Sequence, residues 1–398
     1  MGEDMGEGSA VRFRSGPEGA RAVRFTCFDT IIDLQVYPSC GKQGERLARV
    51  GSGKRSFHID PGCRAVARDR ASCCGSVVPD DAAAPDDALA ACVARCRHFE
   101  RLLSRTDPSS DISRAHAASP DPVPVAPETA ELVRLALPYC AGSRGCFDIT
   151  MGTVTSLWDF HEGIVPSRRA LADALEHVGV EAVEASPADA VAPWLAIRDP
   201  KAVLDLGGIA KGYIADDLAG LLAACGIDRM ALNLGGNVVV RGSAPGAATA
   251  AENAAGCKND TSCGEESAPD GACGNPMPWH IGIADPLHPG RHCAVIELDA
   301  GSVVTSGTRE RRFSRGGVTY HHILDPRTGM PAVTDAASAT VVAERSLDCD
   351  GWSTTVLMLG AQGGIDFAEG VSGIEALTVD ECGRVRWTSG LAGRVVVG

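Results

Sequence analysis

The chain has 398 residues, of which 44% are hydrophobic, so it can bury one large core or two ordinary ones. Its formal net charge of −14 and pI near 5.2 argue against a nucleic-acid surface, and we expect no nucleic-acid partner.

The N-terminal segment has no apolar signal sequence or lipoprotein signal, and no stretch is long enough to span a bilayer. We therefore expect a cytoplasmic protein without a membrane span. Its sixteen cysteines are then expected to be reduced, with Cys92 and Cys96 on the apolar face of a helix. A metal or disulfide cluster of Cys257, Cys263 and Cys273 is the alternative, although their spacing matches no ligand pattern.

The first third of the chain predicts a tail, a hairpin and two helices. Residues 1–21 are polar and predict a disordered tail, and residues 22–37 alternate as a strand or a pair of strands. A Gly- and Arg-rich stretch at about 39–85 predicts an insertion, and apolar periodicity predicts helices at 86–105 and 127–139.

Residues 146–160 mix aromatic and small polar side chains without a clear period. This composition predicts a pocket wall. The alternative is that Phe147, Trp158 and Phe160 only pack in the core. A helix at 167–178 and a strand at 194–198 follow.

The stretch from Val203 to Gly242 is the most informative part of the chain. Its pattern predicts a strand at 203–206, a turn at Gly207 and Gly208, and a helix with Lys211 in its first turn. A helix N-terminus with a lysine beside it favours a bound anion such as a phosphate, although an ordinary turn with a solvated lysine remains open. Two short strands are expected around residues 234–237.

The C-terminal part begins with a second low-complexity insertion, at about 243–278. The pattern then predicts strands at 279–284, 293–298 and 337–343, and a helix at 348–360.

Two pairs of side chains point to chemistry. Asp350 and Thr354 stand four residues apart on one helical face, as oxygen ligands of Mg²⁺ can, although Asp350 could instead cap the helix. His322 lies near Asp325, so it is a candidate general base that Asp325 would orient. A histidine without a chemical role, beside a capping aspartate, is the alternative.

Six ordered motifs together resemble the ApbE family of FAD:protein FMN transferases. Three of the similar segments are Phe147–Thr150 with Leu157-Trp158 (family pattern FDxT…LW), Asp205–Asp216 (DLGxIAKGYxxD) and Leu232–Gly236 (VNxGG). The other three are Thr305–Arg311 (TSGxxER), His322–Gly329 (HIIDPxTG) and Asp350–Thr354 (a D-A-L-x-T helix).

The resemblance implies an α+β fold of mixed sheets with flanking helices, formed by residues 22–398 apart from the two insertions, with an FAD pocket between lobes. It implies Mg²⁺ held by Asp350, Thr354 and the carbonyl of Gly208, with His322 acting in transfer. The residues that it implies for FAD contact or the pocket lining are Phe28, Asp29, Thr30, Phe147, Asp148, Asp205, Lys211, Ile323 and Ser353. Ser353 stands where some relatives carry a carboxylate.

The implied reaction attaches FMN through its phosphate to a Thr or Ser hydroxyl of an acceptor flavoprotein and releases AMP. The partners are then FAD, as substrate, and a protein with a Ser/Thr-containing flavinylation segment. A Mg²⁺-dependent FAD pyrophosphatase would use the same residues, and an FAD-binding protein without turnover is the alternative from another class.

Overall fold

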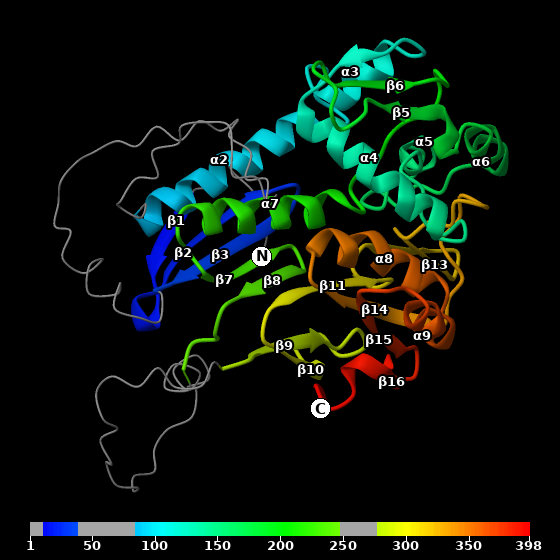
Figure 1. The fold of residues 1–398 in the computed structure, drawn as a ribbon. Helices are drawn as coiled ribbons and strands as arrows, with labels where there is room; N and C mark the ends of the chain where they lie inside the picture. Colours follow the sequence, from blue (N-terminus) through cyan, green and yellow to red (C-terminus); the bar gives the residue numbers. More distant parts are fainter. Residues whose placement is uncertain (1–10, 39–83, 247–276) are drawn as a thin grey trace, which may run out of the picture.

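A nine-stranded sheet is the centre of the computed structural model, which describes residues 11–38, 84–246 and 277–398 (Figure 1). Neighbouring strands pair antiparallel. In order across the sheet the strands are β1 (Arg12–Ser15), β2 (Arg21–Cys27), β3 (Thr30–Tyr37), β7 (Arg229–Leu234), β8 (Asn237–Arg241), β11 (Gly301–Gly307), β14 (Ala336–Ala343), β15 (Ile374–Asp380) and β16 (Val385–Trp387).

Four helices cover one face of this sheet. Helices α2 (Pro85–Leu103) and α7 (Ala210–Ala224) pack on the half that contains β2, β3, β7 and β8. Helices α8 (Ser346–Met358) and α9 (Ala361–Glu369) pack on β11, β14 and β15. On the opposite face, the second half is covered by a small sheet of β9 (Trp279–Ala284), β10 (His292–Leu298) and β17 (Val395–Val397).

A second, mainly helical part lies beside the large sheet, at the upper right of Figure 1. It contains α3 (Asp111–Ala117), α4 (Pro127–Gly142), α5 (Gly152–Thr155) and α6 (Arg168–Leu175), with β4 (Val123–Pro124), β5 (Val183–Ala185) and β6 (Trp194–Ile197). The hairpin β12 (Arg312–Arg315) and β13 (Val318–His321) packs against it through an aromatic cluster. Short 3₁₀ helices occur at Pro17–Gly19, Val180–Ala182 and Ser389–Leu391.

The buried side chain of Arg95 joins three helices. Its Nη1 donates to Glu128 Oε1 at 2.9 Å, and its Nε donates to Asp217 Oδ2 at 2.8 Å. The three residues belong to α2, α4 and α7, so this ion-pair network holds α7 in a fixed place relative to the second part.

The α+β class is confirmed, and most of the predicted elements are present. The hairpin at 22–37, the helices near 86–105, 127–139 and 167–178, the two strands around 234–237 and the helix from about 348 all appear within a few residues of the expected bounds. The helices and strands that were not predicted are α3, α5, α9, β1, β4, β5, β11, β12, β13, β15, β16 and β17.

Two local predictions are wrong. Residues 12–15 are strand β1, paired with β2, so the expected tail of residues 1–21 is not disordered throughout. Residues 203–206 are not a strand, because Val203 forms only an isolated parallel bridge, with Met151. Val203 N donates to Thr153 Oγ1, and Asp205 N donates to Ile149 O. The two insertions lie largely outside the described residues, as does the Cys257, Cys263 and Cys273 group, so they stay predictions.

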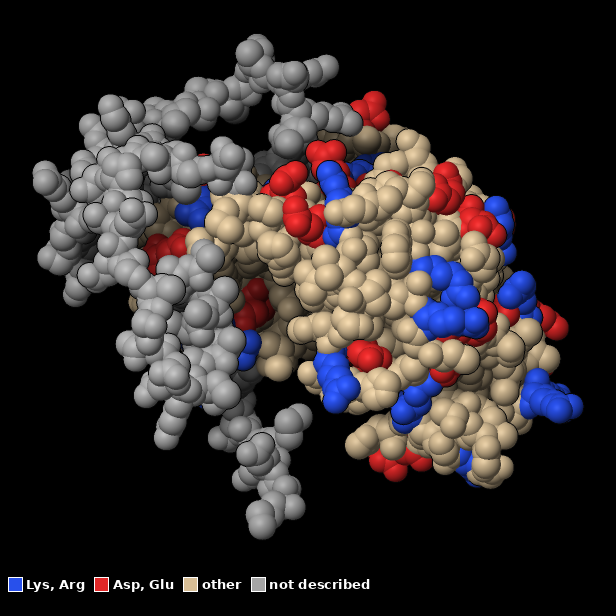
Figure 2. Space-filling model, turned by 90° about the horizontal axis from the view of Figure 1, so that it is seen from below, with Lys and Arg blue, Asp and Glu red and all other residues tan. Residues whose placement is uncertain are grey.

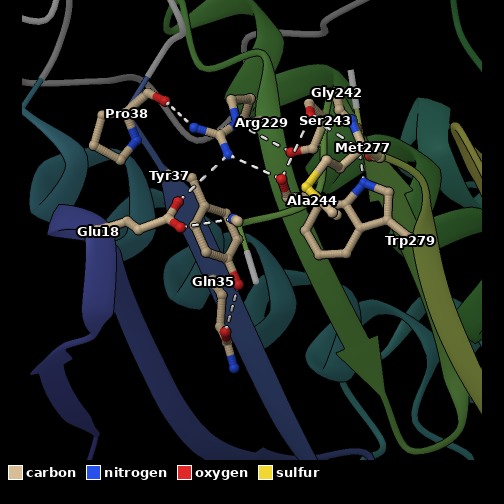
Figure 3. Close-up of polar contacts among 11 residues, drawn as sticks. Glu18, Gln35, Tyr37, Pro38, Arg229, Gly242, Ser243, Ala244, Met277 and Trp279 are labelled. Carbon is tan, nitrogen blue, oxygen red and sulfur yellow. Dashed lines mark hydrogen bonds and ion pairs between the residues drawn. The ribbon is translucent and has the colours of Figure 1, made fainter. Parts of the chain in front are cut away.

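The buried guanidinium of Arg229 joins the described residues that flank the two insertions (Figure 3). It donates to the carbonyl oxygens of Pro38 at 2.8 Å, Ser243 at 3.0 Å and Ala244 at 3.4 Å. It also lies over the ring of Tyr37, at 5.7 Å from the centroid. Pro38 and the pair Ser243 and Ala244, which are distant in sequence, therefore meet in one polar cluster.

The surface and the cysteines agree with the composition. In Figure 2 the basic and acidic side chains lie next to one another, without one continuous basic patch on this face. Nine described cysteines are free, and Cys92 and Cys96 are buried as expected. Within the described ranges, no helix has the length and apolar character needed to cross a bilayer.

Candidate active site

Helices α7 and α8 come together at Gly212 and Asp350. The backbone N–H of Gly212 donates to Asp350 Oδ2 at 2.9 Å. A Cβ atom at position 212 would lie 2.4 Å from Ser346 O and 2.7 Å from Asp350 Cβ, so only glycine allows this approach. The first turn of α7 and the helix bearing Asp350 are therefore in direct contact.

Asp216, one turn further along α7, caps the N-terminus of α8. Its Oδ1 accepts from Ser346 N at 2.8 Å and its Oδ2 accepts from Leu347 N at 2.9 Å, whereas the N-cap residue Arg345 supplies no side-chain bond. Burial raises the pKa of Asp216 to about 6, although both backbone bonds act in the opposite direction. The carboxylate thus fixes α8 relative to α7.

Side chains of both charges, negative and positive, lie around the turn before α7. Asp205 Oδ1 accepts from Gly207 N at 2.9 Å, and Asp205 Oδ2 lies 3.3 Å from Arg105 Nη1. Lys211 is the second residue of α7, as expected, and its Nζ donates to Gly207 O at 3.2 Å. The ammonium group therefore lies against the glycine turn.

Phe147 and Asp148 lie beside this turn. A Cβ atom on Gly208 would be 3.0 Å from Cε2 of Phe147, so the ring packs directly against Gly208. Asp148 Oδ1 accepts from the backbone N and the hydroxyl of Thr150, at 2.7 and 2.6 Å, although desolvation still raises the pKa of Asp148. Trp158 is buried in an aromatic cluster with Phe160, so for these two rings the core interpretation is correct.

The oxygen atoms near the Gly212–Asp350 contact suit a hard cation. Asp350 is the fifth residue of α8, so it does not cap the helix, and it is 4% exposed. Apart from the bond from Gly212 N, no hydrogen bond within the described residues reaches its carboxylate or the hydroxyl of Thr354 one turn later. No group of three or more His, Cys, Asp or Glu side chains that could hold a metal occurs in the described ranges. A carboxylate and a hydroxyl are hard oxygen donors of the kind that Mg²⁺ accepts, and Mg²⁺ needs few protein ligands.

Ser353 links α8 to the end of β11. Its Oγ lies 2.8 Å from Ser306 Oγ and also donates to Asp350 O at 3.2 Å. The residue is buried, so its hydroxyl holds the two elements together beside Asp350.

His322 lies near enough to Lys211 for the positive charge of the lysine to act on the imidazole. Burial lowers the pKa of His322 to about 4, and the positive charges of Arg311 and Lys211 act in the same direction. Nδ1 lies 3.3 Å from Arg311 O. Because a carbonyl accepts, Nδ1 carries the proton in the neutral ring and Nε2 presents its lone pair.

Asp325 does not orient His322, so that part of the prediction is wrong. Its carboxylate accepts from Arg327 Nε at 2.8 Å and from Arg327 Nη2 at 2.7 Å. The backbone carbonyl of Arg311, instead of the carboxylate of Asp325, accepts from the imidazole of His322. Ile323 is partly buried against the core of α8 and α9, and its carbonyl accepts from Ala332 N.

The turn at Phe28 and Asp29 lies at the same end of the sheet. Both residues have positive φ, 55° and 54°, as a two-residue hairpin turn requires. Thr30 touches the next hairpin, since a Cβ on Gly235 would lie 2.3 Å from Thr30 Oγ1. A cavity of about 420 Å³ opens here on the sheet face away from the helices, and its lining includes Thr30, Gly235 and Gly236.

Comparison with known proteins shows the family to which the chain belongs. The model of the ApbE family matches residues 71–378. The chain belongs to the ApbE family. A Treponema pallidum protein named FAD:protein FMN transferase is 33% identical over 304 residues, covering 75% of this chain and 78% of that protein. A Klebsiella pneumoniae protein of the same name is 30% identical over 284 residues, covering 70% and 78%.

Solved structures share the ApbE fold. The ApbE protein of Thermotoga maritima matches with a TM-score of 0.68 and 23% identity, covering 96% of this chain and 99% of that chain. The flavin transferase ApbE of Vibrio cholerae also gives 0.68, with 19% identity and coverage of 94% and 99%.

Sequence reasoning missed three residues of this candidate site. Gly212 and Asp216 lie inside the motif at 205–216, but nothing in the pattern says what they touch. Arg105, next to Asp205, follows the end of α2 and carries no sequence signal at all.

Proposed function

We propose that this ApbE-family chain is a Mg²⁺-dependent FAD:protein FMN transferase. It would move the FMN moiety of FAD to a Thr or Ser hydroxyl of an acceptor flavoprotein and release AMP. The observation that carries the proposal is the hydrogen bond from Gly212 N to Asp350 Oδ2, because it joins the first turn of α7, where an anion would be favoured, to the oxygen donors of α8. Relatives of this chain bear the same enzyme name.

The chain's residues have separate tasks in binding. Asp350, Thr354 and the carbonyl of Gly208 would hold Mg²⁺, which when bound neutralises charge on the diphosphate of FAD. Lys211 would pair with a phosphate oxygen at the start of α7. The ring of Phe147 shields Gly208 from water on one side.

His322 would act as the general base. Its lowered pKa keeps the ring neutral at pH 7, and the bond to Arg311 O leaves Nε2 free to accept a proton. An anionic diphosphate bound nearby would raise that pKa and make the ring a stronger base.

The reaction then balances without a further reactant. The acceptor hydroxyl gives its proton to His322 Nε2, and its oxygen forms a bond to the flavin-side phosphorus. The bond from that phosphorus to the bridging oxygen breaks, and AMP leaves with the bridging oxygen.

The test incubates the protein with FAD, Mg²⁺ and an acceptor protein that carries a Ser/Thr flavinylation segment, and follows AMP and the acceptor mass. Transfer predicts AMP together with an acceptor heavier by one FMN. AMP with free FMN would instead identify a pyrophosphatase, and bound FAD without AMP would identify a binding protein.

A matched pair of variants connects the reaction to the site. Asp350→Ala should abolish AMP release, whereas Asp366→Ala, on the exposed side of α9, should leave it unchanged. Equal rates for the two variants would contradict the role of Asp350.

A further inference from the structure

Asn237, the first residue of β8, has a buried amide group without a partner. The residue is 1% exposed, and within the described residues its Nδ2 has no hydrogen-bond acceptor. A buried donor left unsatisfied costs free energy, and native proteins seldom leave one without a reason.

The strand register shows which way this side chain points. Asn237 pairs with Leu234 on β7 and with Val304 on β11. Residues opposite one another in an antiparallel ladder point to the same face. Leu234 is buried in the core that includes α7, and Val304 in the core that includes α8. Asn237 therefore lies under the helices, on the face of the sheet that carries the Gly212–Asp350 contact.

The position along the strand is equally specific. Val304 stands two residues before Ser306 and so shares its face, and Ser306 Oγ contacts Ser353 Oγ on α8. Strand β8 packs against both α7 and α8. The free amide is thus at the strand end nearest to the proposed metal ligands, directly after the turn at Gly235 and Gly236.

We propose that Asn237 is a further substrate-binding residue of this site, whose amide N–H donates to a diphosphate oxygen of bound FAD. This inference rests on the proposed function. A neutral donor suits the position because a hydrogen bond to an anionic oxygen is stronger than one to a neutral group, and it adds no second positive charge beside Lys211 and Mg²⁺.

The decisive variant is Asn237→Leu, which keeps the side-chain size and removes the donor. The proposal expects ligand-free stability, measured by urea unfolding, to equal or exceed that of the wild type, because an unsatisfied donor is replaced by an apolar group. The dissociation constant for FAD with Mg²⁺, measured by flavin fluorescence, should rise about ten-fold or more.

A second pair of variants tests the charge. Asn237→Asp would place a negative charge at the diphosphate and should weaken FAD binding further. Gln362→Glu is the control, because it makes the same amide-to-carboxylate change at an exposed position of α9, where Gln362 Nε2 donates to Asp366 Oδ1. It should bind FAD as the wild type does.

Three results for Asn237→Leu would overturn the inference. The first is an FAD affinity equal to that of the wild type, and the second is failure of the variant to fold. The third is a loss of ligand-free stability as large, in free energy, as the loss of FAD affinity. The last two would show that the amide serves the fold alone. Failure of the proposed function is distinguishable, because the wild type itself would then bind no FAD or release no AMP, and this inference would fall with it.

Discussion

The close approach of α7 to α8 predicts that Gly212→Ala disrupts the site. The added methyl group would lie 2.4 Å from Ser346 O and 2.8 Å from Ser346 C, which are backbone atoms and cannot rotate away. The helices must therefore separate, and the 2.9 Å bond from Gly212 N to Asp350 Oδ2 must lengthen or break.

The magnitude follows from three opposing effects. Overpacking costs about 1–3 kcal/mol, and a lost hydrogen bond to a charged group costs about 1.5–3 kcal/mol. Alanine regains about 1 kcal/mol through its higher helix propensity. We expect Gly212→Ala to lower the free energy of unfolding by about 1.5–5 kcal/mol, and to weaken FAD binding because Asp350 moves.

The assay is urea unfolding without ligand, followed by FAD titration with Mg²⁺. Gly363→Ala in α9 is the matched control, since its Cβ would meet only Leu359 Cβ at an ordinary 3.8 Å. That variant should be as stable as the wild type, or more stable by up to about 1 kcal/mol. If Gly212→Ala behaved like Gly363→Ala, the reasoning about the α7–α8 contact would be refuted.

Three further predictions follow from the buried charges. Arg95→Met should lower the free energy of unfolding by about 3–5 kcal/mol, because it leaves the carboxylate of Glu128 buried without its partner. Arg198→Met, which removes an exposed ion pair, should lower it by at most about 1 kcal/mol. Urea unfolding of both variants measures this difference. Asp216→Ala should lower the free energy of unfolding by about 1–2 kcal/mol, because the first N–H groups of α8 lose their acceptor. It should also weaken FAD binding, measured by titration. Unchanged binding would contradict the role of Asp216 in positioning α8. The pKa of His322 is about 4 in the folded state, below its ordinary 6.5, so the folded state resists protonation and the stability of the wild type should fall as the pH falls from about 6.5 to 4. Urea unfolding at pH 7 and at pH 4.5 should show a smaller loss of stability in His322→Gln than in the wild type. Equal losses in the two proteins would contradict the burial of the imidazole.

Local sequence patterns were enough to predict about half of the described helices and strands. The helix of residues 85–103 has apolar side chains that recur on one face, and the hairpin of residues 21–37 alternates buried and exposed side chains. Both patterns depend on neighbours a few residues away, so they can be read without knowing the rest of the chain. The expected strand at 203–206 failed because its backbone groups bond to Ile149 and Thr153, about fifty residues earlier.

The candidate site divides in the same way. Lys211, Asp350 and His322 could be named from residue type, spacing and family motifs. Their partners could not, since Asp325 pairs with Arg327 instead of orienting His322.

The sequence by itself determined the α+β class, about half of the described helices and strands, and the chemical groups available for binding and catalysis. Only the tertiary structure decided that Gly212 touches Asp350, that Asp216 caps α8 and that the amide of Asn237 lies buried without a partner. The physical reason is that periodicity and residue chemistry are local, whereas a hydrogen bond between residues more than a hundred positions apart exists only once the sheet and its helices have packed.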